Sequence, residues 1–230
     1  MDVLNKPLNF LVSISIPIII SVLSILILLS PLFMNLEYRR PNFPEDKYGF
    51  STEERLDFGN QTRRYLISGM DLNDLRELKF EDGVSIYTER ELKHLEDVKI
   101  VIMGVLRVFT GFVIVLSVGG ILAYTQYWKA DFLKAIFLGG RITTGLLIII
   151  LFLTLVSFQS LFTNFHLIFF EGDSWLFYYS DSLIRLFPIR FWQDIFLLFG
   201  ITTLAGGIIL GWVLPARRPR SGNNTPTSIT

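Results

Sequence analysis

The chain contains two histidines, His94 and His166, and their positions relative to four apolar segments point to a shared site. His94 stands just before the second apolar segment, and His166 follows the third. Consecutive membrane spans run in opposite directions, so both histidines are expected at the same face of a membrane. Because an imidazole titrates near neutral pH, it readily accepts and donates protons. This arrangement predicts proton-transfer chemistry at a membrane surface.

Two charged residues could assist these histidines. Asp97 follows His94 by three positions, so the two side chains share one helix face, where the carboxylate could orient the imidazole. The alternative is a surface histidine beside a carboxylate that caps the helix or forms a salt bridge. Arg107 lies inside the second apolar segment, where a buried arginine must meet a carboxylate or a polar substrate group. Its alternative is to extend outward to the membrane surface.

The apolar segments predict an all-α integral membrane protein with four transmembrane helices. They cover residues 8–34, 100–124, 142–162 and 191–214, and each holds roughly the 20 apolar residues that a bilayer core requires. The predicted organisation has four parts. Residues 1–34 form a tail and the first transmembrane helix, and residues 35–99 form an extracytoplasmic helical cap. Residues 100–214 hold transmembrane helices two to four with an aromatic outer loop at 163–190, and residues 215–230 form a tail that is polar and disordered from Ser221.

Basic residues in the short connections predict the orientation. Lys129, Lys134 and Arg141 lie between the second and third apolar segments, and Arg217, Arg218 and Arg220 follow the fourth. Cytoplasmic connections carry an excess of Lys and Arg, so both termini are expected in the cytoplasm. The cap, the aromatic loop and both histidines are then expected at the outer face.

Capping patterns predict where the helices of the cap begin. Ser51 with Glu54 and Thr88 with Glu91 have the spacing of a capping box. The first of these helices should end near Gly69, and a second short helix should cover residues 72–78. No helix breaker follows Thr88, so one helix is predicted from Glu89 through the second span, which raises His94 one to two turns above the membrane.

The outer loop is unusually aromatic, with Phe165, Phe169, Phe170, Trp175, Phe177, Tyr178, Tyr179 and Phe187. Such residues are typical of membrane-interface anchors, and they could also form the walls of a substrate site. Both interpretations remain open from the sequence. His166 stands in an apolar stretch of this loop, where a neutral imidazole still needs a hydrogen-bond partner.

Composition excludes several functional classes. The 21 basic and 21 acidic residues balance, and no basic cluster of the kind that binds nucleic acid occurs. Cysteine is absent, which excludes disulfides, thiolate metal sites and cysteine nucleophiles. No phosphate-binding loop, dinucleotide fingerprint, HExxH or GxSxG motif is present. Two histidines with Asp97 could hold a metal, but the usual pair of ligands on one helix is missing, so neither a metal nor another cofactor is predicted.

Four short segments, in this order and at these topological positions, resemble the bacterial lipoprotein intramolecular transacylase (Lit) family: His94–Lys99, Phe165–Phe170, Trp175–Phe177 and Asp181–Pro188. The resemblance covers nearly the whole chain. It implies that His94 and His166 are the catalytic residues and that the protein resides in the bacterial plasma membrane.

The resemblance also implies a reaction, in which the sn-2 acyl chain of a diacylglyceryl lipoprotein moves to the amino group of its N-terminal cysteine and leaves a lyso-form lipoprotein. The expected partners are therefore a diacylated lipoprotein N-terminus and membrane lipids. Supporting roles are assigned to Asp97 and Asp181, the latter on the resemblance more than on spacing. Substrate-positioning roles are assigned to Arg107 and Trp175.

The residues suit this chemistry independently. Transfer of an acyl group from an ester to an amine needs a base for the amine and an acid for the departing oxygen, and two histidines can fill both roles. Both reacting groups belong to one substrate, which favours the reaction by proximity. A different lipid-directed membrane enzyme with the same histidine pair, or a non-catalytic protein that binds lipid or partner chains, remains an alternative.

Overall fold

The structure, a computed structural model, describes residues 2–216 and is helical throughout them except for loops and one isolated antiparallel bridge between Lys79 and Ser85. Its bundle is formed by α1 (Asp2–Leu28), α5 (Glu89–Thr125), α6 (Lys129–Val156) and α9 (Ile189–Ile208), which continues through a π-helical turn (Ile209–Val213) into α10 (Leu214–Ala216). Four helices are long and apolar enough to cross a membrane. The all-α prediction with four spans is therefore confirmed.

Close backbone contact holds α6 against the C-terminal part of the fourth span, where α9 passes into the π-helical turn. A Cβ atom placed on Gly140 would lie 2.5 Å from the backbone nitrogen of Gly211, so only glycine permits this approach. Beside it, Ser13 of α1 donates a hydrogen bond of 3.0 Å to the backbone oxygen of Ala135 in α6. Small and hydroxyl side chains at helix crossings are the usual means of packing where surrounding lipid is as apolar as the helices.

Two predicted spans have different ends in the structure. The first stops at Leu28 instead of Met34, because Ser30 caps a separate helix, α2 (Pro31–Tyr38), with Pro31 at its first position. The third begins at Lys129 and ends at Val156, because Ser157 turns the chain and caps α7 (Phe158–Phe169). The basic connection predicted before the third span is therefore helical. An apolar run marks the bilayer-sized stretch, while caps decide where the helix ends.

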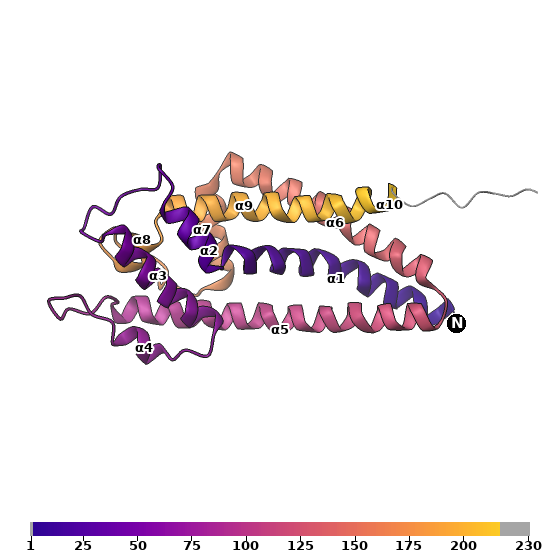
Figure 1. The fold of residues 1–230 in the computed structure, drawn as a ribbon, viewed down its shortest axis with the longest axis horizontal. Coiled ribbons are helices and arrows are strands. Elements are labelled where there is room, and N and C mark those ends of the chain that lie inside the picture. The colour runs from indigo at the N-terminus through magenta and orange to yellow at the C-terminus, as the bar shows by residue number, and fades with distance from the viewer. Residues whose placement is uncertain (1, 217–230) are drawn as a thin grey trace, which may run out of the picture.

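The remaining helices gather at one end of the bundle (Figure 1). They are α2, α3 (Thr52–Ile67), α4 (Leu72–Arg76), α7 and α8 (Ser182–Leu186). Both predicted capping boxes are present at Ser51 and Thr88, and α5 runs unbroken from the cap through the bundle. An apolar core joins α3, α4 and α8 to the first turns of α5 through Tyr65, Leu75, Leu92 and Leu186.

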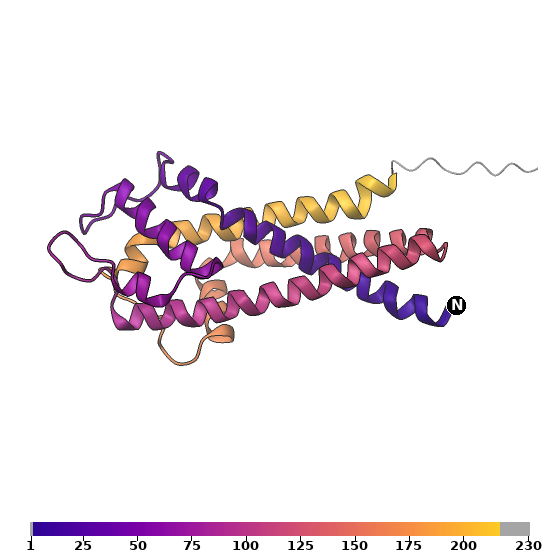
Figure 2. The ribbon, with the colours of Figure 1, turned by 60° about the horizontal axis from the view of Figure 1, so that its bottom comes forward.

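Both described ends of the chain lie at the end of the bundle opposite the cap (Figures 1 and 2). This placement agrees with an even number of spans. The predicted tail at 215–230, with its three arginines, falls outside the described residues after Ala216.

Candidate active site

His94 lies on the second turn of α5, where the helix leaves the cap core. Leu92 and Leu95 on either side of it are buried in that core, and the imidazole itself is 8% exposed. A rigid helix that begins at a capping box therefore fixes the position of this side chain.

His166 reaches the same place from α7, the short helix that follows the third span. The ring centroids of His94 and His166 lie 6.2 Å apart, and the ring planes differ by 20°. The Nδ1 atom of His166 lies 2.8 Å from the backbone oxygen of Phe162. Because that oxygen can only accept, Nδ1 carries the proton and Nε2 keeps a free electron pair. The two histidines are thus brought together, and one has the tautomer of a base.

Aromatic side chains enclose the two imidazoles. The ring of Trp175 lies 4.8 Å from that of His166, and the ring of Phe177 lies 5.4 Å from that of His94. Phe170 contacts both histidines, at 4.9 Å and 5.5 Å. The aromatic loop therefore lines the histidine pair instead of serving only as an interfacial anchor.

Two buried polar atoms in this enclosure make no hydrogen bond within the part of the chain that the structure describes. They are Nδ1 of His94 and Nε1 of Trp175. A buried polar group without a partner is costly, and such groups often mark the place of a ligand or water. The enclosure can therefore offer an indole N–H donor and an imidazole to a bound polar group.

Burial also changes the titration of the site. Removal from water lowers the pKa of His166 below its ordinary value, and the hydrogen bond to the Phe162 oxygen opposes this only in part. The neutral imidazole is therefore the form that this environment favours, which is the form that accepts a proton.

Comparison with known proteins identifies the family of this chain. The sequence profile of the lipoprotein intramolecular transacylase Lit family matches residues 10–192. The chain belongs to the Lit family. Membership in a transacylase family identifies it as a membrane enzyme that transfers acyl groups.

An uncharacterized protein from Aquifex aeolicus (strain VF5) is 34% identical to this Lit family member over 213 residues, which cover 90% of this chain and 95% of the relative. The in meso structure of the membrane-integral Lit from Bacillus cereus has the same fold, with a TM-score of 0.76 at 19% identity over 94% of this chain and 96% of that one. A structure of the Bacillus cereus protein with a histidine-to-arginine mutation gives a TM-score of 0.54 at 18% identity, over 93% and 91% of the two chains.

In this Lit family member, the two carboxylates predicted to orient the histidines have other partners. Asp97 forms an ion pair of 3.3 Å with Lys93 and makes no hydrogen bond to His94, although its charge acts on the imidazole through space. Asp181 accepts a hydrogen bond of 2.8 Å from the backbone nitrogen of Tyr178, at the start of α8, and the backbone of Phe162 holds His166 instead. Each carboxylate is therefore bound by a donor within four residues of it in the chain.

Arg107 does not face the bundle interior. Its side chain is exposed on α5 and has no ion pair or hydrogen bond among the described residues. No residue of the most apolar stretch of this helix is buried inside the protein. The alternative of an outward-extended arginine fits this position, and a substrate-positioning role stays a prediction.

Glu91 is a site-supporting residue that the sequence marked only as a helix cap. It is completely buried, and one carboxylate oxygen accepts hydrogen bonds from the backbone nitrogen and hydroxyl of Thr88. The other oxygen accepts a hydrogen bond of 2.7 Å from the backbone nitrogen of Leu183 in α8. Glu91 thus ties the end of the aromatic loop to the helix that carries His94. Its third-position spacing from Thr88 was visible in the sequence, but its contact with α8 was not.

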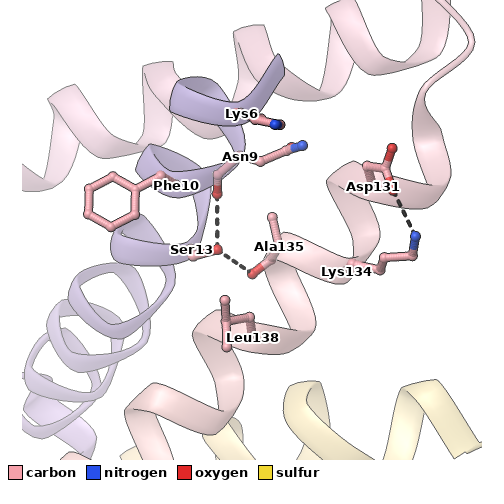
Figure 3. A pocket seen from close by; sticks show the side chains of 8 residues that line it. All are labelled: Lys6, Asn9, Phe10, Ser13, Asp131, Lys134, Ala135 and Leu138. Atoms are coloured by element: carbon pink, nitrogen blue, oxygen red, sulfur yellow. Dashed lines mark hydrogen bonds and ion pairs between the residues drawn. The ribbon is translucent and has the colours of Figure 1, made fainter. Parts of the chain in front are cut away.

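A hollow also lies at the end of the bundle opposite the cap, between α1 and α6 (Figure 3). Its volume is about 620 Å³, and its polar lining is Lys6, Asn9 and Ser13 on one side and Asp131 and Lys134 on the other. Lys134 and Asp131 form an ion pair of 2.8 Å with each other. This hollow contains no side chain suited to acid–base catalysis near neutral pH, so the histidine pair is the candidate active site.

Proposed function

We propose that this chain transfers the sn-2 acyl chain of a diacylglyceryl lipoprotein to the amino group of the lipoprotein's N-terminal cysteine. The observation that carries this proposal is the pair of stacked imidazoles, 6.2 Å apart, inside an aromatic enclosure with unpartnered polar atoms. Formation of the amide breaks the ester and releases the glycerol oxygen, so one proton leaves the amine and one reaches that oxygen. Two imidazoles facing one substrate group can serve both transfers.

The hydrogen bond of His166 assigns the base. His166 has its proton on Nδ1, and its free Nε2 acts as the base that removes a proton from the attacking amine. The proton that His166 takes from the amine passes to the neighbouring ring of His94, whose centroid lies 6.2 Å away. His94 then donates a proton to the departing glycerol oxygen, so both imidazoles end the turnover neutral, as they began. No enzyme nucleophile is needed, because the amine of the substrate itself attacks.

Trp175 stabilises the reaction intermediate. Its indole Nε1–H is buried without a partner, and its ring lies against the base, His166. Acyl transfer places negative charge on the ester carbonyl oxygen in the tetrahedral intermediate, and a fixed donor directed at that oxygen lowers the barrier. Trp175 supplies that donor, which is a sharper role than the positioning predicted for it from the sequence.

The site faces the outside of the bacterial plasma membrane, and both termini lie in the cytoplasm. The basic residues near the ends of α5, α6 and α10 support this orientation through the positive-inside rule. The partners are the diacylated lipoprotein N-terminus and the membrane lipids around it.

Expression in a host that lacks this activity tests the proposal. A reporter lipoprotein is isolated, and mass spectrometry of its N-terminal peptide locates the acyl chains. We expect a free sn-2 hydroxyl and an N-acylated cysteine. A reporter that keeps both acyl chains on glycerol would exclude the proposed reaction, and a different modified lipid would favour another lipid-directed activity.

The pH dependence of the reaction should reflect the burial of His166. Since burial lowers the pKa of this base, the neutral form persists below the ordinary histidine value of about 6.5. The amine of the lipopeptide also titrates, with an ordinary pKa of about 7.7–8.0, and only its neutral form attacks. The measurement is therefore kcat/KM for a purified diacyl lipopeptide against pH, divided at each pH by the neutral fraction of that amine. The corrected activity should remain as the pH falls through the ordinary histidine value and decline only as the pH falls through the lower pKa of His166 in the folded protein. A corrected acidic limb with its midpoint at or above the ordinary value would contradict His166 as the buried base.

A further inference from the structure

A second cavity lies in the cap, beside the aromatic loop. Its volume is about 390 Å³, and its walls come from the loop between α2 and α3, from α3, and from the segment that runs through α8 to Pro188. Tyr48 and Tyr179 contribute to its lining and are exposed by 53% and 83%. The cavity is therefore open to the surface and has aromatic residues within reach of a bound chain.

The charge of this cavity is not balanced by the protein. Arg185 forms a buried ion pair of 3.0 Å with Asp46. Burial raises the pKa of Asp46, but hydrogen bonds from Arg185 and from the Phe50 backbone hold it below its usual value, so this pair is charged and neutralises itself. Arg55, Lys47 and Glu45 also line the cavity, and neither cation has an ion pair among the described residues, although the charge of Asp46 acts on Arg55 through space.

Arg55 is the unusual member of this set, because it is only 4% exposed and yet has no ion pair among the described residues. Its Nη1 donates a hydrogen bond of 2.7 Å to the backbone oxygen of Pro44, its Nε is buried without a partner, and its guanidinium stands over the rings of Tyr38 and Phe43. Its Nη2 makes no hydrogen bond within the described residues. A buried guanidinium with free donors is a binding site for a carboxylate.

The cavity is close to the histidine pair along the chain. Phe177 contacts His94, and Tyr179, only two residues later, lines the cavity. Two residues span at most about 7 Å of backbone. A polypeptide whose N-terminal cysteine is held between the histidines can therefore reach the cavity with its next few residues.

We propose that this cavity binds the polypeptide segment that follows the lipidated cysteine and that Arg55 recognises an acidic side chain in it. This inference rests on the proposed function, since it takes a lipoprotein as the substrate. It makes the cap a specificity element, which selects among lipoproteins by the charge of their first residues, while the histidine pair performs the same chemistry on all of them.

Binding of lipopeptides to the full chain in zwitterionic nanodiscs tests this proposal without turnover. The probes carry two ether-linked alkyl chains, which cannot be transferred, and a fluorophore at the C-terminus. Each contains one Glu or one Gln at a position between two and six residues after the cysteine. At the best position, we expect the Glu peptide to bind about 10-fold more tightly than its Gln partner, as a charge-assisted hydrogen bond would require.

Variants identify the residue responsible. Arg55→Met keeps an unbranched side chain beside Tyr38 and Phe43 and should abolish the preference for Glu. Arg64→Met is the matched control, because Arg64 lies on the exposed face of the same helix and does not line the cavity. Lys47→Ala removes the exposed cation of the cavity and should reduce the preference to about threefold. This variant tests the cavity even if Arg55→Met fails to fold.

Three results separate the outcomes. An unchanged preference for Glu in both cavity variants overturns the assignment. Loss of the preference when phosphatidylglycerol is added, with equal loss of lipid binding in Arg55→Met, overturns it in favour of an anionic lipid. A preference for Glu that depends on Arg55, together with no acyl transfer from the corresponding diacyl ester peptides, supports the binding site and excludes the proposed reaction.

Discussion

Replacement of His166 or His94 by asparagine should reduce production of the lyso-form lipoprotein by about 10²–10⁴-fold, the usual contribution of general acid–base catalysis. Asparagine preserves much of the shape and polarity of the side chain but cannot exchange a proton near neutral pH. The double variant should be little worse than either single variant, because residues that act as a unit are not additive. The measurement is the acyl position on a reporter lipoprotein, normalised to the amount of enzyme in the membrane.

Asn164→Ala is the control for these variants. Asn164 lies on the same short helix as His166 and is exposed, so its loss should leave activity near the wild-type level. Wild-type acyl transfer by His166→Asn would remove the base from the mechanism. An activity loss with an equal loss of membrane-inserted protein would instead mean that the histidines stabilise the fold.

Trp175→Phe should lower kcat by about 10²–10³-fold, the typical cost of removing one donor to an oxyanion. Phenylalanine keeps an aromatic ring against His166 but removes the indole N–H, so KM should change little. Single-turnover rates with a diacyl lipopeptide would separate the chemical step from substrate binding.

Trp128→Phe provides a matched comparison. Trp128 is 7% exposed and also has a buried Nε1 without a partner, but it lies at the start of α6, beside Phe132, at the end of the bundle away from the cap (Figure 1). Its replacement should leave kcat unchanged. Equal losses in the two variants would indicate a general effect on packing, and an unchanged kcat in Trp175→Phe would exclude the indole donor.

The sequence alone determined the features that depend on neighbouring residues. Four apolar runs of bilayer length gave the number of spans, and the Ser51 and Thr88 capping boxes gave the starts of α3 and α5, because a cap involves residues only three positions apart. Alternating span directions then placed His94 and His166 at the same end. Short segments around these histidines resemble the Lit family, and the profile comparison confirmed that the chain belongs to it.

The tertiary structure decided which groups meet. Asp97 and Asp181 had suitable positions in the sequence, but the hydrogen bonds and ion pairs they form are with Lys93 and with the Tyr178 backbone. The breaks at Ser30 and Ser157 lie within apolar runs, where hydropathy does not register the hydrogen bonds of a cap. The histidine pair, with ring centroids 6.2 Å apart, and the hydrogen bond from Leu183 to Glu91 each join segments that are distant in the chain. The cavity around Arg55 is likewise lined by segments on both sides of the bundle helices in the sequence. Such contacts depend on how helices pack, and no local pattern encodes them.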